Sequence, residues 1–291
     1  MKLFSDSMPF YKANFHCHTT CSDGQLTPAE CMEFYRDAGY QVLSVTDHRR
    51  VTDPGPAPAG LLMLPGIELD FMLPEQCVHI IGVGVQKEIE TGWDPAGTPQ
   101  LAVDAVRRFG GRAILAHPAW SLNTPALIGS LKGLCGTEIW NSVSTIPHNA
   151  DRSDSSSLLD VAWTSGPLLN VLAGDDSHWY DGEAGRSATM VQAESLTPEG
   201  ILSALDAGRF YATLGPLVRQ VTVENGSVTV EHSPADTVIF YSNRPWVNGR
   251  CRTGLGMTRS VYEICPGDRF VRCEIRDAEG RRAWTSPVAV N

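Results

Sequence analysis

Residues 14–24 read NFHCHTTCSDG and place two histidines one residue apart at the end of an apolar stretch. Because side chains alternate along a strand, His16 and His18 point to one face and Cys17 points to the other. An Asp-Gly turn that contains Asp23 follows directly. This spacing suits a metal site, a thiol site or a polar strand end, so the rest of the chain has to distinguish the three interpretations.

Short apolar runs alternate with amphipathic segments on both sides of this stretch. Helix signals separate several runs: Thr27 is a candidate N-cap with Glu30 three residues later, and residues 197–208 repeat a Thr-Pro start and a Gly stop. The alternation predicts an α/β domain, and about seven strands favour a closed or nearly closed barrel. The runs short enough to be buried strands are 13–18, 41–46, 61–68, 77–85, 112–117, 136–141 and 168–174.

The pattern changes near residue 215. Beyond it, short alternating segments are broken by Gly, Asn and Asp, and no helix pattern competes with them. Such segments are typical of a small β-sandwich. We therefore expect two domains, a barrel over residues 1–215 and a β-sandwich over residues 216–291.

Composition narrows the class of protein. The 291 residues are 42% hydrophobic with a formal net charge of −10 and no Lys/Arg run, which argues against a nucleic-acid polymer as partner. No stretch approaches the roughly 20 apolar residues that cross a bilayer, and no secretory signal is evident, so we expect a cytoplasmic protein without a membrane partner. Eight cysteines without a C-x-x-C motif favour free buried thiols over disulfides or a zinc ribbon.

Histidines and carboxylates gather where the predicted strands end. Catalytic groups of an α/β barrel collect at the C-terminal ends of its strands, so these residues are expected to converge on one mouth. His79 is the exception, because it lies near the start of its run. A mixed set of imidazoles and carboxylates suits Zn²⁺, Mn²⁺ or Fe²⁺. The candidate ligands are His16, His18, Asp23, His48, Glu68, His79, His117, Asp176 and His178.

Seven short motifs occur in order between residues 13 and 213: H-x-H, S-D-G, T-D-H, P-G-I-E, H-I-I-G, H-P and D-S-H. This set resembles the polymerase and histidinol phosphatase (PHP) family. The resemblance implies a distorted seven-stranded α/β barrel with a centre of two or three divalent metal ions, and hydrolysis of phosphate esters. The β-region that follows the junction GRFYATLGP resembles a stand-alone branch that includes a hydrolase of the carbamate carbaryl.

The resemblance also implies how the ligands divide among the metals, with Glu68 bridging the first two. The first set is His16, His18, Glu68 and Asp176, the second is Glu68, His79 and His117, and the third is Asp23, His48 and His178. Asp23 stands where some relatives have a histidine. Asp175 is an alternative to Asp176, although the D-x-H spacing favours Asp176.

Clustered metals lower the pKa of a bound water and clamp phosphoryl oxygens. We therefore predict a metal-dependent phosphoesterase that hydrolyses a small soluble phosphate ester (nucleotide, sugar or cyclic phosphate) by attack of a metal-bound hydroxide. Glu68, Asp176 and His178 are its expected catalytic residues. The alternatives are a carboxylic or carbamate ester hydrolase with the same centre, and a non-catalytic metal-binding regulatory module.

Contacts to the substrate are less constrained by the sequence. Arg49, Arg186 and His148 are candidate substrate-binding residues, because an arginine grips phosphate bidentately and His148 follows the sixth run. Each of these three residues is alternatively an exposed loop residue without a role in binding. The same two interpretations apply to Arg50, which follows Arg49. Glu138 and Asn141 lie near the end of the sixth run, where they either shape the pocket or form a structural pair. His232 lies in the β-region, and we expect it at the surface.

Overall fold

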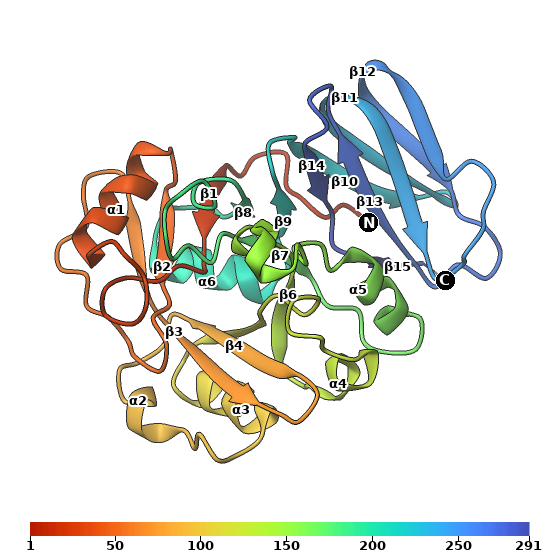
Figure 1. The fold of residues 1–291 in the computed structure, drawn as a ribbon. Coiled ribbons are helices and arrows are strands. Elements are labelled where there is room, and N and C mark those ends of the chain that lie inside the picture. The colour runs from red at the N-terminus through yellow and green to blue at the C-terminus, as the bar shows by residue number, and fades with distance from the viewer. Residues whose placement is uncertain (291) are drawn as a thin grey trace.

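In the computed structural model, which describes residues 1–290, each of the seven predicted runs overlaps a β-strand (Figure 1). These strands are β1 (Phe10–Asn14), β2 (Val42–Val45), β3 (Leu62–Met72), β4 (Cys77–Val83), β5 (Arg112–Leu115), β6 (Leu134–Asn141) and β7 (Val171–Gly174). β1, β2, β5 and β7 end shortly before their histidine motifs, which therefore occupy the loops that follow, whereas Glu68 and His79 lie within β3 and β4.

Two more strands extend this sheet beyond β1. β8 (Ala188–Gln192) pairs antiparallel with both β1 and β9 (Phe210–Thr213). The α/β class is confirmed, but this part of the chain has nine strands where the sequence patterns predict seven. Within residues 1–290 no backbone ladder joins β7 to β8. Instead, the Thr189 hydroxyl accepts from Ala173 N at 3.1 Å and donates to Ala173 O at 3.0 Å.

Two of the helices, α1 and α6, begin at the Thr-Pro signals that the sequence shows. Thr27 and Glu30 form a capping box at the start of α1, and Thr197 caps α6. No helix within residues 1–290 has the length and apolar character to cross a membrane. The helices are α1 (Pro28–Asp37), α2 (Ile89–Gly92), α3 (Pro99–Arg108), α4 (Pro125–Ser130), α5 (Ser156–Trp163) and α6 (Pro198–Asp206), with 3₁₀ turns η1 (Val143–Thr145) and η2 (Pro147–Asn149).

Strand direction brings the candidate ligands to one end of the sheet. β1, β2 and β3 are parallel to one another, as are β5, β6 and β7, whereas β4 is antiparallel to both β3 and β5. The start of β4 therefore lies beside the C-terminal ends of its neighbours, and His79 pairs with Asp70 of β3. This reversal explains why His79 lies early in its run and still reaches the same end as the other candidates.

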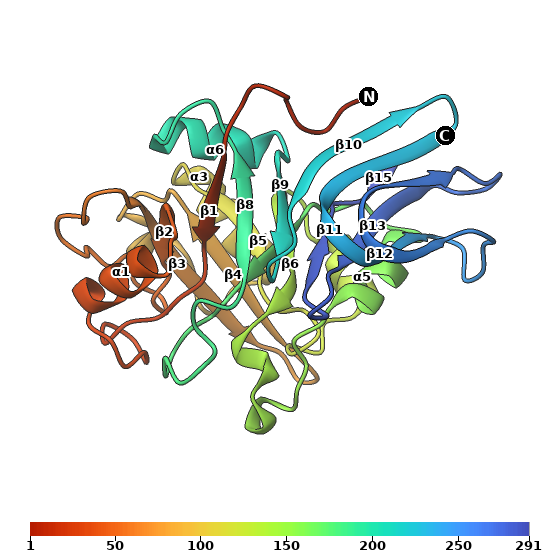
Figure 2. The same cartoon turned by 90° about the horizontal axis from the view of Figure 1, so that it is seen from above.

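The strands after residue 216 surround an apolar core that also takes in Phe4 and Tyr211 from the first part of the chain. The long strand β11 pairs with β10, β12 and β13 (Figure 2). β10, β11 and β13 form one continuous hydrogen-bonded path, from which β12 branches. That path continues into the first part of the chain, because β14 pairs with β9. The strands are β10 (Val218–Glu224), β11 (Ser227–Ser242), β12 (Cys251–Glu263), β13 (Phe270–Arg276), β14 (Arg282–Trp284) and β15 (Val288–Ala289).

Side chains of α5 and β6 contact the C-terminal strands. The buried Arg272 of β13 donates two hydrogen bonds of 2.6 Å to the carboxylate of Asp160 in α5. Trp284 of β14 stacks on Trp140 of β6 at 5.8 Å between ring centroids. A charged pair and an aromatic stack therefore join the two parts.

His232 is a correction to the sequence interpretation, because it is fully buried rather than at the surface. Its Nδ1 lies 2.7 Å from Ser233 O and its Nε2 lies 3.1 Å from Ser260 Oγ. The strand pattern did not reveal the burial, because polar partners within the same sheet satisfy both ring nitrogens. Burial lowers the pKa of this imidazole below its ordinary value.

Candidate metal centre

The nine candidate ligands form one continuous cluster at the C-terminal end of the parallel strands. Three overlapping groups within it bring ligand atoms within 4.8 Å of one another, which is close enough to share an ion. These groups are His18, Asp23, His48 and His178; His16, His18 and Asp176; and His16, Glu68 and His117.

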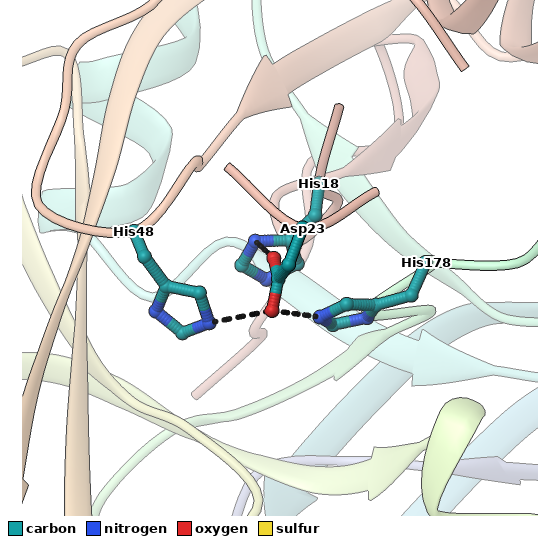
Figure 3. Close-up of side chains that lie close together, drawn as sticks. All are labelled: His18, Asp23, His48 and His178. Carbon is teal, nitrogen blue, oxygen red and sulfur yellow. Dashed lines mark ion pairs between the residues drawn. The ribbon is translucent and has the colours of Figure 1, made fainter. Parts of the chain in front are cut away.

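The outermost group gathers around the carboxylate of Asp23 (Figure 3). Asp23 Oδ2 lies 3.6 Å from His48 Nε2 and 3.4 Å from His178 Nε2, while Oδ1 lies 3.5 Å from His18 Nδ1. Asp23 is exposed and His18 is buried, so this group spans the distance from the surface to the base of the site. It contains the three residues expected to hold a third metal.

Glu68 and Asp176 lie deeper, among the imidazoles of the H-x-H motif. Asp176 Oδ1 lies 3.2 Å from His16 Nε2 and 3.1 Å from His18 Nε2. The two oxygens of Glu68 face different histidines: Oε1 lies 3.3 Å from His16 Nε2, and Oε2 lies 3.2 Å from His18 Nε2. A carboxylate with both oxygens directed at separate imidazoles has the geometry of a bridging ligand.

His79 and His117 approach Glu68 from β4 and from the loop after β5. His79 Nδ1 is 2.8 Å and His117 Nε2 is 3.6 Å from Glu68 Oε1. Nδ1 of His117 is 2.9 Å from Ser121 Oγ, which leaves Nε2 directed towards the carboxylates. The structure thus brings together the three residues expected around a second metal, although His79 lies outside the tightest groupings.

Within residues 1–290, four buried polar atoms of this cluster have no hydrogen-bond partner: His16 Nε2, His18 Nε2, His48 Nδ1 and Glu68 Oε2. A buried polar atom without a partner costs about 1–3 kcal/mol, so such atoms are rarely concentrated in one place. All four belong to candidate ligands, and imidazole nitrogens and carboxylate oxygens suit Zn²⁺, Mn²⁺ or Fe²⁺. The donor set therefore fits bound divalent cations.

Charge pairing dominates the electrostatics of the cluster. Burial lowers the pKa of His18, but the carboxylates of Asp176 and Glu68 outweigh it and raise that pKa to about 9. Burial likewise opposes the effect of Glu68 and Cys77 on His79, whose pKa rises to about 10. Burial raises the pKa of Asp176, but the neighbouring histidines hold it well below its usual range. A cation bound here has to displace protons from these imidazoles.

Glu138 orients two of the histidines. Its Oε1 accepts from His16 Nδ1 at 2.9 Å, and its Oε2 accepts from the backbone N–H of His117 at 2.9 Å. Asn141 donates to Glu138 Oε2 at 2.9 Å and to Asp176 Oδ2 at 3.2 Å. Because an ionised carboxylate only accepts, His16 carries its proton on Nδ1 and presents Nε2 to the cluster. The two residues whose role the sequence left open thus contact the site directly.

Two candidate ligands have left-handed backbone conformations. His117 has φ of 26° and Asp176 has φ of 52°. Non-glycine residues in this region cost about 1–3 kcal/mol and concentrate at functional sites. The loops after β5 and β7 therefore hold these side chains in conformations that the chain does not adopt by local preference.

Asp175 has a different environment from its neighbour Asp176. Its buried carboxylate accepts from the Ser187 backbone N–H at 2.9 Å, from the Gly185 backbone N–H at 2.7 Å and from Tyr35 Oη at 3.1 Å. Burial raises its pKa despite these bonds. Asp175 ties the loop after β7 to α1, whereas Asp176 faces the histidines.

The candidate substrate contacts are mostly directed elsewhere. Arg49 is engaged in two hydrogen bonds with Asp70, of 2.9 and 2.7 Å, and Arg50 is exposed. Arg186 is exposed and lines a different pocket beside Lys12 and Leu217, so the structure does not bring it to the cluster. His148 is exposed at the rim, where its ring centroid lies 5.1 Å from that of Trp179.

A pocket of about 220 Å³ opens onto the cluster. Besides seven of the candidate ligands, its lining contains Trp120, Val143, Asn149 and Trp179. None of these four residues belongs to a motif that the sequence shows. Trp120 lies three residues after His117 and Trp179 lies one residue after His178, so proximity to a ligand motif is the signal that points to the two tryptophans.

Comparison with known proteins extends this description. No family model matches the chain. A 5'-3' exoribonuclease of Haemophilus influenzae is 30% identical over 81 residues, which are 26% of this chain and 30% of the length of that enzyme. This chain therefore spans less than a third of the curated relative that it matches, and the activity of the whole relative does not transfer by this similarity.

Solved structures give broader coverage. A two-domain protein of Bacteroides vulgatus, described as containing a predicted PHP-like metal-dependent phosphoesterase, aligns with a TM-score of 0.54 at 18% identity. The alignment covers 97% of this chain and 96% of that chain. An amidohydrolase from Chromobacterium violaceum, with bound sulfate and no metal, aligns with a TM-score of 0.46 at 20% identity over 68% of this chain and 96% of its own. The second similarity is too weak to support an argument.

Fold and cluster together define a mixed α/β protein whose strand ends carry a set of residues able to hold metal ions. The fold is PHP-like, as the ordered motifs predict.

Proposed function

We propose that the protein is a metal-dependent phosphoesterase that hydrolyses a small soluble phosphate ester. The observation that supports this proposal best is the group of four buried, unpartnered ligand atoms at the base of an open pocket. A protein that used these histidines only for packing would have satisfied those atoms with hydrogen bonds. The net charge of −10 agrees better with a small substrate than with a nucleic-acid polymer.

Divalent ions held by these residues supply Lewis acidity and a water molecule of lowered pKa. The chain contributes the placement of its ligands. Glu68 directs its two oxygens to different histidines, and Glu138 fixes the tautomer of His16. Asp23 and His178 lie towards the surface, where they face an entering substrate. Glu68, Asp176 and His178 are the proposed catalytic residues of this reaction.

Elemental analysis of the purified protein, combined with an activity screen, tests the proposal. The screen compares nucleoside, sugar, cyclic and aryl phosphates, together with an oligoribonucleotide, with and without added Mn²⁺. We expect bound divalent metal and hydrolysis of at least one small ester. The His16→Ala variant is expected to lose that activity, whereas His232→Ala, which removes a buried histidine far from the cluster, retains it. Wild-type protein that is metal-loaded, inactive on the whole panel and indistinguishable from His16→Ala would refute the proposal.

A second candidate is the hydrolysis of a carboxylic or carbamate ester by the same centre. The lining of the pocket within residues 1–290 contains no lysine or arginine, and a neutral ester needs such a cation less than a phosphate does. A panel of aryl carboxylates and aryl carbamates distinguishes the two. Turnover of these esters without turnover of any phosphate ester assigns the second function.

A further inference from the structure

Two tryptophans border the pocket next to different ligands. The Trp120 ring lies edge-on to the rings of His117 and His79, at centroid distances of 4.9 and 5.9 Å. The Trp179 ring lies 5.5 Å from that of His178. Both indoles line the pocket that contains Glu68 and Asp176. A substrate bound at the cluster therefore has an aromatic wall beside each of two groups of imidazoles.

The loop that carries Trp179 is held in place by a single buried carboxylate. Oε1 of Glu183 accepts the backbone N–H groups of His178 at 3.2 Å, Trp179 at 2.7 Å and Tyr180 at 2.5 Å. The other oxygen, Oε2, accepts the N–H of Asp181 at 2.9 Å. Although the Trp179 side chain is 37% exposed, its backbone is therefore fixed beside the pocket. A fixed, partly exposed indole loses little conformational entropy when it binds a ring.

Lysine and arginine do not line the described part of this pocket. The nearby Arg49 is paired with Asp70. Bound metal ions would therefore supply the positive charge that a phosphate group in the pocket needs. No arginine in the described lining is placed to select that phosphate through bidentate hydrogen bonds. The uncharged residues of the lining then determine which substrates bind. The largest of these residues are the two tryptophans.

We propose that the alcohol part of the substrate carries a planar aromatic ring that packs against Trp120 and Trp179. This inference rests on the proposed phosphoesterase function and specifies its substrate class. In the reaction, water adds to phosphorus, the bond between phosphorus and the ester oxygen breaks, and the ring-bearing alcohol leaves with a proton. Simple aryl phosphates and nucleotides share the required chemistry.

Ligand binding tests the inference without requiring turnover. Phenylphosphonate and methylphosphonate share a non-hydrolysable phosphonate group and differ in the ring. Calorimetry on the full-length, Mn²⁺-loaded protein is expected to show that phenylphosphonate binds roughly tenfold more tightly, as an aromatic contact of about 1–1.5 kcal/mol provides. Trp120→Ala and Trp179→Ala are each expected to reduce this ratio at least threefold. Trp246→Ala removes an exposed tryptophan outside the pocket lining and leaves the ratio unchanged.

Kinetics on phenyl phosphate, a nucleoside 5'-monophosphate and glycerol phosphate separate the two sources of the ring. The tryptophan substitutions are expected to raise KM for the ring-bearing ester and to leave glycerol phosphate unaffected. Equal affinity of wild-type protein for both phosphonates overturns the inference, as does a ratio that neither pocket substitution changes. Absence of turnover on every ester refutes the phosphoesterase function itself, and the phosphonate ratio still decides whether the pocket selects a ring.

Discussion

The substitution Glu138→Gln tests whether Glu138 prepares His16 for metal binding by fixing the tautomer of its imidazole. Glu138 accepts from three donors: His16 Nδ1, the backbone N–H of His117 and Asn141 Nδ2. Glutamine has nearly the same shape but one oxygen and one NH₂ group. If its oxygen keeps the bonds to His117 and Asn141, its NH₂ group faces His16 Nδ1.

That arrangement forces His16 to accept at Nδ1 and to carry its proton on Nε2. Nε2 is the atom that lies 3.3 Å from Glu68 and 3.2 Å from Asp176, so the protonated tautomer has no lone pair to offer a metal there. Restoring the ligand requires the NH₂ group of the glutamine to face an N–H group, a mismatch of about 1–3 kcal/mol. We therefore expect metal affinity to fall about 10- to 100-fold, which agrees with the effect of other groups that orient ligands.

The assay is competition for Zn²⁺ or Mn²⁺ between the protein and a chromophoric chelator, with thermal unfolding measured in parallel. Glu274→Gln is the matched control. Glu274 is also buried and accepts from Trp284 Nε1 at 2.9 Å and Arg276 Nε at 2.7 Å, but it belongs to β13, away from the cluster. Wild-type metal affinity in Glu138→Gln refutes the tautomer argument. An equal loss of affinity in both variants attributes the effect to general destabilisation.

Three further predictions concern other parts of the chain. In Gly24→Ala, the new Cβ clashes with the backbone carbonyl of His18 and displaces the loop that carries Asp23. We expect denaturant titration to show a free energy of unfolding lower by about 1–3 kcal/mol. Metal binding should also weaken, although the substitution replaces no candidate ligand. Arg272→Met leaves the Asp160 carboxylate without its partner, and urea unfolding is expected to show a loss of about 3 kcal/mol, whereas an unchanged midpoint contradicts a role for this pair. Burial lowers the pKa of His232 below 6.5, so the unfolded chain binds this proton more tightly. Its contribution to stability is present above about pH 6.5 and is lost as the pH falls through the folded pKa. His232→Gln should therefore reduce the fall in Tm at acidic pH when Tm is measured between about pH 5 and 8 at saturating metal.

Much of the fold was predictable, because buried strands of an α/β sheet are short apolar runs. Runs such as residues 77–85 and 112–117 correspond closely to β4 and β5. β8 and β9 escaped prediction for physical reasons. β8 buries Thr189 and Gln192, which break its apolar pattern, and β9 lies directly before the junction near residue 215, where the sequence pattern changes.

The candidate ligands were predictable for a different reason. Their residue types and their order along the chain are visible in the sequence, and the structure brings all nine together. Their surroundings were not predictable, because Glu138 acts through contacts with residues more than 20 positions away. Arg186 has a residue type suited to phosphate binding and lies eight positions after His178, yet it lines another pocket. Residue type and proximity in the sequence therefore did not suffice to predict a substrate contact.

The ladder between β9 and β14 has a consequence for how the chain unfolds. Thr213 pairs with Ala283 and Ala212 pairs with Trp284, so the predicted domain boundary near residue 215 interrupts a continuous set of backbone hydrogen bonds. A shortened chain that ends there would expose the edge of β9, and exposed edges promote aggregation. We therefore expect the full-length protein to melt in a single cooperative calorimetric transition, because the C-terminal strands cover the edge of the sheet that carries the candidate ligands.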